Sequence, residues 1–457
     1  MKLTVIGGGG VRSMFLAKSL AQRVDELHIE EITFMDNSET KLNIYGAMAR
    51  EVAKRINPGV KFNLTLDPVE AVRGADYIIT TIRPGEDQKR VDDERIALSH
   101  NVIGQETTGA AGFSFAMRSI PALAQYCELI KKYSAPNVKV FNFTNPAGVV
   151  SQTLRDMGYD FTFGICDAPS SLLRSFAKLY NVAPESVTGD CFGLNHLSFF
   201  NSVKLNGREI LPELLDNDKL YTDTEMCFFD KKFAKSFGHI INEYLYYFFY
   251  REQAVENILK AGVTRGEVIR DINRHMTEEL SHMDIENNFD GCLEVFDKWY
   301  GKRTNAYMEN ETGVVSHKKP FHFDINEKDE GGYAGVALKY IEAEQTKTPA
   351  EMIMCVPNRG AIPGLRDDDV VEVTCTISPD GYTPHKIAAP DEIPMEIIRR
   401  VKIYERYASL AIRTHSRKAA VECLMLHPLV NSYSLASEMI DQYLESNKEY
   451  LKEWQNA

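Results

Sequence analysis

The sequence predicts an α/β protein, in which a doubly wound parallel sheet is followed along the chain by an α+β domain. Over the first 165 residues, short β-branched runs alternate with segments of helical period, which favours parallel strands joined by right-handed crossovers. Beyond residue 166 the pattern changes to hairpin-like strands and long helices. A chain of 457 residues with 44% apolar composition can bury two such cores. We therefore expect two domains, residues 1–165 and residues 166–457.

The composition excludes several classes of protein. With 65 acidic against 52 basic residues the net charge is −13, which disfavours nucleic-acid binding because phosphate contacts need clustered cations. No run approaches the roughly 18 apolar residues of a membrane-spanning helix, and the N-terminal MKLTVIGGGG lacks a signal-peptide cleavage pattern. The eight cysteines form no CxxC pair, which is typical of reduced thiols. We expect a cytoplasmic protein with neither a nucleic-acid nor a membrane partner.

Six strands are expected in the first domain, the number that a complete dinucleotide-binding sheet uses. They cover residues 3–6, 31–35, 61–64, 77–82, 139–143 and 161–165. Amphipathic segments between them, for example residues 11–23, 40–54 and 113–132, are the expected crossover helices.

The second domain has a mixed pattern. Residues 191–205 are strand-like and end at an Asn206-Gly207 turn, which predicts a hairpin. Residues 310–335 are polar and contain Gly331-Gly332, so we expect a mobile loop or lid there. Of the remaining segments, 232–260, 397–425 and 434–454 have helical patterns and 368–377 is strand-like.

A glycine-rich loop from Gly7 to Gly10 follows the first strand and opens a helix. Glycine lets the backbone approach a pyrophosphate whose charge lies at the helix N-terminus. The second strand ends at Asp36, where an adenosine ribose would lie, although Arg12 replaces the third glycine of the usual fingerprint. A plain tight turn is the alternative. The strand, the helix and Asp36 together favour a dinucleotide, and the acid favours NAD over NADP.

Polar residues follow the fourth and fifth strands, at the sheet edge where ligands collect. Arg83, Lys89 and Arg90 would hold a substrate anion there, or belong to a solvated helix start. Glu106 lies in a loop of small residues. Asn145 precedes Pro146 and is expected to be extended, with its amide directed at a sugar hydroxyl, although Asn-Pro is also a common turn.

Cys166 follows the sixth strand, and His196 lies thirty residues later in strand-like sequence. A thiolate and an imidazole with neighbouring oxygen donors bind divalent transition metals and leave positions open for substrate. A core cysteine and a structural histidine explain the same residues. Tyr244 lies in an aromatic segment whose period predicts core packing, yet a tyrosine becomes a general base if a metal or cation lowers its pKa.

Taken in this order, these segments resemble the NAD-dependent glycoside hydrolases of family 4, an exception to two-carboxylate glycosidase chemistry. The resemblance covers most of the chain. It rests on the glycine loop and on FMDNS, TTIRPG, GQETTGAAG, NFTNPAG, GICDAP, GLNHLSF, NEYLYY and CVPNRGAI.

The resemblance implies a mechanism. Cys166 and His196 hold a divalent metal, usually manganese, which also binds the sugar C2 and C3 oxygens. NAD takes hydride from C3, Tyr244 removes the C2 proton, and Asp167 protonates the leaving aglycone; water then adds and hydride returns. The residues implied for NAD are Gly7, Gly9, Gly10, Val11, Arg12, Asp36 and Asn37.

Residue 167 decides the subclass in this resemblance. A Cys-Asp pair resembles the 6-phospho-α-glucosidases, whereas Cys-Asn is typical of 6-phospho-β-glucosidases and Cys-His of unphosphorylated α-galactosidase or α-glucosidase relatives. The implied substrate is a 6-phosphorylated α-glucoside such as maltose 6′-phosphate. Its phosphate is expected on Arg90 and Arg265, and its sugar on Glu106, Asn145 and Asn195.

Three alternatives stay open. The first is a 6-phospho-β-glucosidase of the same family. The second is an NAD-dependent oxidoreductase like lactate and malate dehydrogenases, which share this topology but need no Cys–His metal site. A regulatory NAD-binding module is the third, and Asp167 and Tyr244 argue against it because a sensor needs neither an acid nor a base. The resemblance also implies a homodimer or homotetramer.

Overall fold

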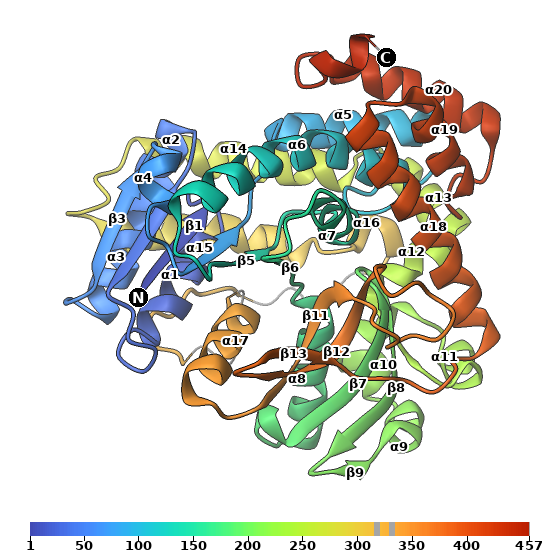
Figure 1. The fold of residues 1–457 in the computed structure, drawn as a ribbon, viewed down its shortest axis with the longest axis horizontal. Helices are drawn as coiled ribbons and strands as arrows, with labels where there is room; N and C mark the ends of the chain where they lie inside the picture. The colour runs from blue at the N-terminus through green and yellow to red at the C-terminus, as the bar shows by residue number, and fades with distance from the viewer. Residues whose placement is uncertain (315–319, 329–333, 457) are drawn as a thin grey trace.

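The computed structural model describes residues 1–314, 320–328 and 334–456, and two sheets organise them (Figure 1). The larger sheet has nine strands in the order β13-β12-β11-β6-β5-β4-β1-β2-β3. Strands β1 to β6 are parallel, and their order 3-2-1-4-5-6 is that of a complete dinucleotide-binding sheet. They span Lys2–Ile6, Glu31–Met35, Lys61–Thr65, Tyr77–Thr80, Lys139–Asn142 and Thr162–Gly164. The predicted fold class is confirmed, and each of these strands lies within two residues of its predicted bounds.

Helices cover both faces of this parallel sheet. Successive residues of a strand direct their side chains to opposite faces, so the apolar side chains on each face are buried under helices. On one face, α1 and α3 bury Leu16 and Ala49 against Phe34. On the other face, α4 and α6 bury Val72 and Ile130. The helices of this region are α1 (Ser13–Gln22), α2 (Glu39–Lys41), the π-helical turn η1 (Leu42–Gly46), α3 (Ala47–Ile56), α4 (Pro68–Val72), α5 (Glu86–Ser99), α6 (Gly109–Tyr133) and α7 (Ala147–Asp156).

The second half of the chain contributes strands to both sheets. Strands β11 (Ala350–Pro357), β12 (Val370–Ser378) and β13 (Gly381–Pro384) continue the large sheet beyond β6, all antiparallel. Strands β7 (Val187–Leu194), β8 (Leu197–Leu205), β9 (Arg208–Glu209) and β10 (Ile240–Ile241) form the smaller antiparallel sheet. The predicted hairpin and the 368–377 strand are thus present.

The predicted helix over residues 232–260 is wrong, because the segment is broken. Helix α11 (Lys231–Phe237) ends at Gly238, whose φ of +77° stops the helix. Strand β10, the 3-10 turn η4 (Glu243–Leu245), α12 (Tyr246–Phe249) and α13 (Arg251–Ala261) follow. The aromatic residues produced a helical pattern, but they pack from several short elements instead.

The remaining helices pack on several parts of the molecule: α8 and α9 on the smaller sheet, α17 on β11, and α18 and α20 on α7 and α5. Helices α18–α20, drawn in red, lie at the side of the molecule away from β3 (Figure 1). The predicted 397–425 helix is interrupted at His415, which has φ +53°. Bounds are α8 (Ala168–Tyr180), η2 (Pro184–Ser186), α9 (Leu211–Asp216), α10 (Leu220–Asp223), η3 (Glu225–Phe228), α14 (Arg265–Ser281), α15 (Phe289–Asn305), α16 (Glu309–Thr312), α17 (Gly335–Thr346), α18 (Glu392–Thr414), α19 (Arg417–Leu426), α20 (Tyr433–Ser446) and η5 (Lys452–Asn456).

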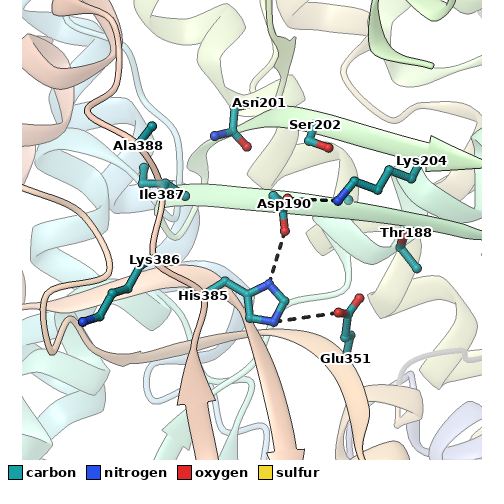
Figure 2. Close-up of a pocket in the computed structure, with 11 residues that line it drawn as sticks. Thr188, Asp190, Asn201, Ser202, Lys204, Glu351, His385, Lys386, Ile387 and Ala388 are labelled. Atoms are coloured by element: carbon teal, nitrogen blue, oxygen red, sulfur yellow. Dashed lines mark hydrogen bonds and ion pairs between the residues drawn. The ribbon is translucent and has the colours of Figure 1, made fainter. Parts of the chain in front are cut away.

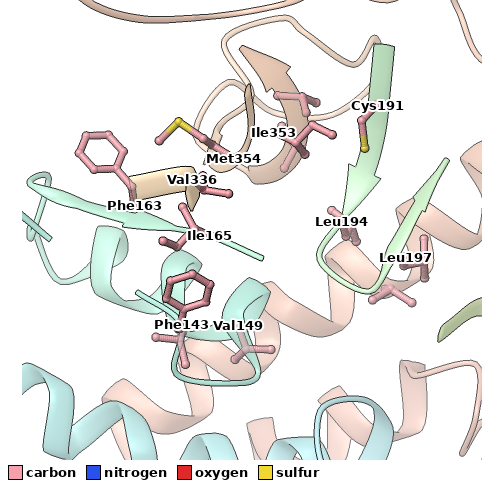
Figure 3. Close-up of a cluster of buried hydrophobic side chains, with 14 of the residues drawn as sticks. Phe143, Val149, Phe163, Ile165, Cys191, Leu194, Leu197, Val336, Ile353 and Met354 are labelled. Atoms are coloured by element: carbon pink, nitrogen blue, oxygen red, sulfur yellow. The ribbon is translucent and has the colours of Figure 1, made fainter. Parts of the chain in front are cut away.

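One apolar core joins the two halves of the chain. Figure 3 shows Phe143, Val149 and Ile165 from the first half facing Leu194 and Met354 from the second. A second cluster holds helices α14 and α15 against α1 and α3. Burial of this apolar surface at the junction makes the two halves one packed body.

The polar loop predicted over 310–335 lies partly outside the described residues, which omit 315–319 and 329–333 and therefore Gly331-Gly332. Its flanks are α16 and α17. In the described part of the chain, no helix combines the length and the apolar character needed to span a membrane.

Candidate active site

The glycine loop between β1 and α1 brings its backbone against the ends of two other strands. Gly7 has φ +102°, and a Cβ at this position would lie 2.5 Å from the Thr81 carbonyl oxygen. A Cβ on Gly9 would lie 2.9 Å from the Asp36 carboxylate, which accepts a 2.9 Å hydrogen bond from the Gly9 N–H. Only glycine fits these positions. The loop and the acid predicted for a dinucleotide therefore meet, and the bare backbone before α1 suits a pyrophosphate.

The other residues predicted for the cofactor lie around this loop. Gly10 and Val11 continue it, and Asn37 is exposed just beyond Asp36. Arg12 precedes the first residue of α1, and its side chain also lines a separate arginine-rich cavity. Arg12 thus stands between the cofactor loop and that cavity.

Cys166 and His196 come together despite their separation in sequence. Cys166 follows β6, and His196 occupies the turn between β7 and β8. The Cys166 Sγ lies 3.7 Å from the His196 Nε2. If one metal ion bound a sulfur at about 2.3 Å and a nitrogen at about 2.1 Å with a tetrahedral angle between the bonds, the two ligand atoms would lie about 3.6 Å apart. The spacing fits a shared cation. Among the described residues no cluster of three or more His, Cys, Asp or Glu surrounds such a position.

His196 lies in a turn rather than in the strand that its sequence context predicts. Its φ is +61°, and the strand prediction is wrong here because no glycine marks this left-handed position. Gly193 prepares the turn: a Cβ there would lie 2.3 Å from the Leu197 carbonyl oxygen. The tight connection holds the imidazole at the end of the hairpin, next to Cys166.

Tyr244 stacks on His196. The two ring centroids lie 3.8 Å apart with an interplanar angle of 7°. Asn242 positions the tyrosine, since its Oδ1 accepts a 3.0 Å hydrogen bond from the Tyr244 N–H at the start of η4. Tyr244 is therefore presented by a short turn beside the cysteine and the histidine, and not within a long core helix.

Burial and nearby carboxylates keep these groups neutral. Burial, followed by the charge of Glu372, raises the pKa of the Cys166 thiol. Burial and the charge of Glu243 raise the pKa of Tyr244, and burial lowers the pKa of His196 to about 4. A neutral imidazole is the form that binds metals, and a coordinated cation favours the thiolate.

Glu372 of β12 adds a buried carboxyl that sequence analysis did not identify. Its Oε1 accepts a 3.0 Å hydrogen bond from Asn195 Nδ2, and burial raises the pKa of Glu372 to about 7. Asn195 adjoins His196 in the hairpin turn, so a residue predicted to bind sugar orients this carboxyl.

A cavity of about 100 Å³ opens beside Tyr244. The same tyrosine thus contacts the His196 ring and lines the cavity. Arginine residues line it from several elements; they are Arg12, Arg90 of α5, Arg265 of α14 and Arg303 of α15.

Arg90 and Glu106 pair inside this cavity. Arg90 binds Glu94 at 2.8 Å and Glu106 at 3.0 Å, and Glu106 also binds Arg83 at 2.5 Å. Burial alone would raise the pKa of Glu106, but Arg83 and Arg90 outweigh it and lower that pKa to about 2. Glu106 is therefore an ionised hydrogen-bond acceptor, which suits a sugar hydroxyl.

Arg265 is held by the end of a neighbouring helix. It is the first residue of α14, and Thr264 and Glu267 form a capping box around it. Its Nη1 and Nη2 donate to the carbonyls of Ala306 and Arg303, at 2.7 and 2.8 Å. These carbonyls lie at the C-terminus of α15, where the helix dipole favours a cation.

Of the residues predicted to act on the substrate, Asp167, Asn145 and Asn195 lie outside the cavity lining. The Asp167 carboxylate accepts a 2.7 Å hydrogen bond from Arg174, and its side chain is 35% exposed. Asn145 forms a cis peptide bond with Pro146, and its carbonyl accepts a 3.3 Å bond from Ser119.

A larger polar hollow of about 620 Å³ lies between the smaller sheet and the segment after β13. Figure 2 shows His385 between Asp190 and Glu351, at 3.2 and 3.8 Å. None of the predicted site residues lines it. The smaller cavity beside Tyr244 is therefore the candidate active site.

Fold and site together describe a doubly wound, dinucleotide-type protein with a cysteine–histidine pair and a cavity lined by arginines. Comparison with known families identifies the class. A model of "Family 4 glycosyl hydrolase" matches residues 2–182, and one of the "Family 4 glycosyl hydrolase C-terminal domain" matches residues 191–430. The chain belongs to family 4 of the glycosyl hydrolases.

Relatives with both anomeric specificities are similar over their whole length. The 6-phospho-beta-glucosidase BglT of Thermotoga maritima is 29% identical over 99% of this chain and 100% of its own. The phospho-alpha-glucosidase PagL of Clostridium acetobutylicum is 25% identical, covering 99% and 98%. The solved 6-phospho-beta glucosidase from Thermotoga maritima with manganese, NAD+ and glucose-6-phosphate has a TM-score of 0.80 at 28% identity, over 98% and 99% of the chains.

The dehydrogenase-like fold is also confirmed. A malate dehydrogenase from Salinibacter ruber superposes with a TM-score of 0.50 over 92% of this chain and 99% of its own. At 13% identity this likeness concerns the fold alone.

Proposed function

We propose that the chain hydrolyses 6-phosphorylated glucosides with NAD and a divalent cation, manganese, as cofactors. The observation that carries the proposal is the position of Tyr244, which stacks on His196 beside Cys166 and lines the arginine cavity. A phosphate bound by guanidinium groups would place its sugar against this tyrosine. The two similar phospho-glucosidases, and the manganese, NAD+ and glucose-6-phosphate in one relative, support the same chemistry.

The residues fit both cofactors. The loop from Gly7 to Arg12, with Asp36 and Asn37, would bind NAD, while Cys166 and His196 would hold the cation. Bound there, NAD would supply hydride exchange at the sugar C3, and the cation would supply positive charge for the C2 and C3 oxygens. Residues 1–165 would then form the NAD-binding domain and residues 166–457 the substrate- and metal-binding domain.

The protein's side chains would supply the proton transfers. Tyr244 removes the C2 proton through its phenolic oxygen, and its raised pKa means that the phenolate needs positive charge nearby. Asp167 protonates the glycosidic oxygen as the C1–O bond breaks. Arg90 and Arg265 bind the phosphate, while Glu106, Asn145 and Asn195 orient the sugar.

The α-linked substrate is the first candidate because Asp167 follows the metal-binding cysteine. An α-glucoside with a poor leaving group needs an acid, and asparagine would supply none. The β-linked substrate is the second candidate. It is favoured by the likeness to BglT and by the ion pair with Arg174, in which Asp167 accepts rather than donates.

A substrate panel tests the proposal. The purified protein is assayed on p-nitrophenyl α- and β-glucoside 6-phosphates and on the unphosphorylated α-glucoside, with manganese, NAD and a thiol reductant. We expect cleavage of the α-linked phosphorylated substrate, loss on chelation and recovery with manganese. Faster cleavage of the β-linked substrate would establish the second candidate. Activity that survives chelation or needs no phosphate would refute the site, and NADH accumulation with a hydroxy acid would indicate an oxidoreductase.

We further expect this activity in the cytoplasm and in a homodimer or homotetramer. Analytical ultracentrifugation of the purified chain checks the assembly, and a monomer at micromolar concentration would contradict it.

A further inference from the structure

The charges of the cavity beside Tyr244 are unevenly compensated. Arg90 is paired with Glu94 and Glu106. By contrast, Arg303 forms no ion pair within the described residues, and its only side-chain hydrogen bond there is a 3.3 Å bond from Nη1 to Asn273 Oδ1. A partly buried guanidinium without a counter-ion is costly unless an anion completes its surroundings.

The wider charge count also favours an anion. Among the described residues that line the cavity, four are arginines (Arg12, Arg90, Arg265 and Arg303) and three are glutamates (Glu94, Glu106 and Glu311). Burial and the neighbouring charge of Arg12 lower the pKa of Arg303 to about 10. The cationic side chains therefore outnumber the carboxylates in this lining, which suits an anion such as a phosphate.

The packing of α15 fixes where Arg303 lies. Phe296 and Cys292 of this helix are buried against Met14 of α1 and Met48 of α3. At its C-terminus, the Arg303 and Ala306 carbonyls accept hydrogen bonds from Arg265. The helix is thus anchored to the parallel-sheet unit at one side and to Arg265 at its end, so Arg303 enters the cavity from a rigid element.

We propose that Arg303 is a further specificity-determining residue, which binds the phosphate group of the substrate together with Arg265. The proposal rests on the proposed function, because it assigns the phosphate-binding end of the same site. It adds a phosphate contact from α15 that the sequence motifs did not identify. The pyrophosphate of NAD is the other phosphate group that arginine side chains could bind. The lining of the cavity favours the phosphate of the substrate, because it includes Tyr244 and none of the residues from Gly7 to Gly10.

The test compares Arg303→Met with Lys302→Met, its neighbour on α15. Lys302 is exposed and lies over the Trp299 ring at 4.0 Å, away from the cavity lining. Binding of glucose 6-phosphate, inorganic phosphate and NAD is measured by calorimetry, and folding by circular dichroism. We expect Arg303→Met to weaken glucose 6-phosphate binding about 10- to 100-fold, as for a lost charge-assisted hydrogen bond, with NAD binding unchanged. Lys302→Met should leave both affinities unchanged.

A conservative variant covers the case in which Arg303→Met does not fold. Arg303→Gln can retain the contact to Asn273 but lacks the charge, and the same loss of glucose 6-phosphate binding is expected. Weakened NAD binding with intact glucose 6-phosphate binding, or no change in either, would overturn the proposal. Those outcomes can be told apart from an error in the proposed function. If the proposed function were wrong, the unaltered protein would neither bind glucose 6-phosphate nor cleave the phosphorylated substrates.

Discussion

Two residues next to the candidate metal ligands face different surroundings. Tyr244 lies against the His196 ring, and its neighbour Glu243 is buried. Asp167 directly follows Cys166, but its carboxylate turns to Arg174 and is partly exposed. Of the predicted proton-transfer pair, only Tyr244 therefore lines the cavity. The role of Asp167 stays a prediction, and it can be tested at this one side chain.

Replacing Asp167 by asparagine should reduce cleavage of α-linked substrates according to their leaving group. A poor leaving group such as a sugar alkoxide depends on protonation, and losing a general acid typically costs about 10²- to 10⁴-fold in rate. An activated aryl leaving group needs little help. Steady-state rates on maltose 6′-phosphate and on the p-nitrophenyl substrate measure the difference. Equal losses on both would exclude Asp167 as the acid.

The buried carboxyl of Glu243 should make stability fall as the pH rises. Burial and the charge of Glu225 raise the pKa of Glu243 from 4.5 to about 8. Between these pH values the folded chain holds a proton that the unfolded chain has released, so the free energy of unfolding decreases with pH. Urea titrations at pH 5, 6.5 and 8 should show a shallower decrease for Glu243→Gln than for the unaltered chain. The exposed Glu278→Gln is the control, and an unchanged slope in Glu243→Gln would contradict the expectation.

At the scale of elements, the glycine loop shows how tightly a turn can depend on backbone space. Gly7 has a positive φ, and a Cβ at this position would lie 2.5 Å from the carbonyl oxygen of Thr81. Gly59 lies in an exposed turn and has its nearest atom at 3.5 Å. The two glycines therefore form a matched pair.

Gly7→Ala should weaken NAD binding and destabilise the fold by about 1–3 kcal/mol, the usual cost of such backbone strain. Gly59→Ala should change neither property measurably. Fluorescence titration with NADH and urea unfolding test both variants. If Gly7→Ala bound NADH as tightly as the unaltered chain, the loop would not be the dinucleotide site.

Sequence predicted the elements well where their patterns are local. The six parallel strands have β-branched runs bounded by turn residues, and the glycine loop and Asp36 carry their own signals. The hairpin turn at His196 was missed because no glycine marks its left-handed backbone, and the break at Gly238 was missed because the aromatic residues around it produced a helical pattern. Arg303 and Glu372 were missed because each reaches the site only through the packing of its element, α15 or β12.

At the scale of the whole molecule, the two halves of the chain share one sheet. Strands β11–β13 extend the parallel sheet beyond β6, with Cys355 paired to Gly164. The apolar contacts of Figure 3 also cross this boundary. The Cys166–His196 pair lies at the same junction, since Cys166 follows β6 and His196 lies in the turn between β7 and β8. The site and the core therefore depend on both halves together.

This shared sheet predicts that the full chain unfolds as one cooperative unit. Separating the halves would expose the edge of β6 and the buried side chains of Phe143 and Ile165, so neither half should unfold independently. Scanning calorimetry should show a single transition with equal calorimetric and van't Hoff enthalpies. NAD at about 100 times its dissociation constant should stabilise that whole transition by about 2.7 kcal/mol. Two transitions, of which NAD shifts only one, would show instead that residues 1–165 form an autonomous cofactor domain.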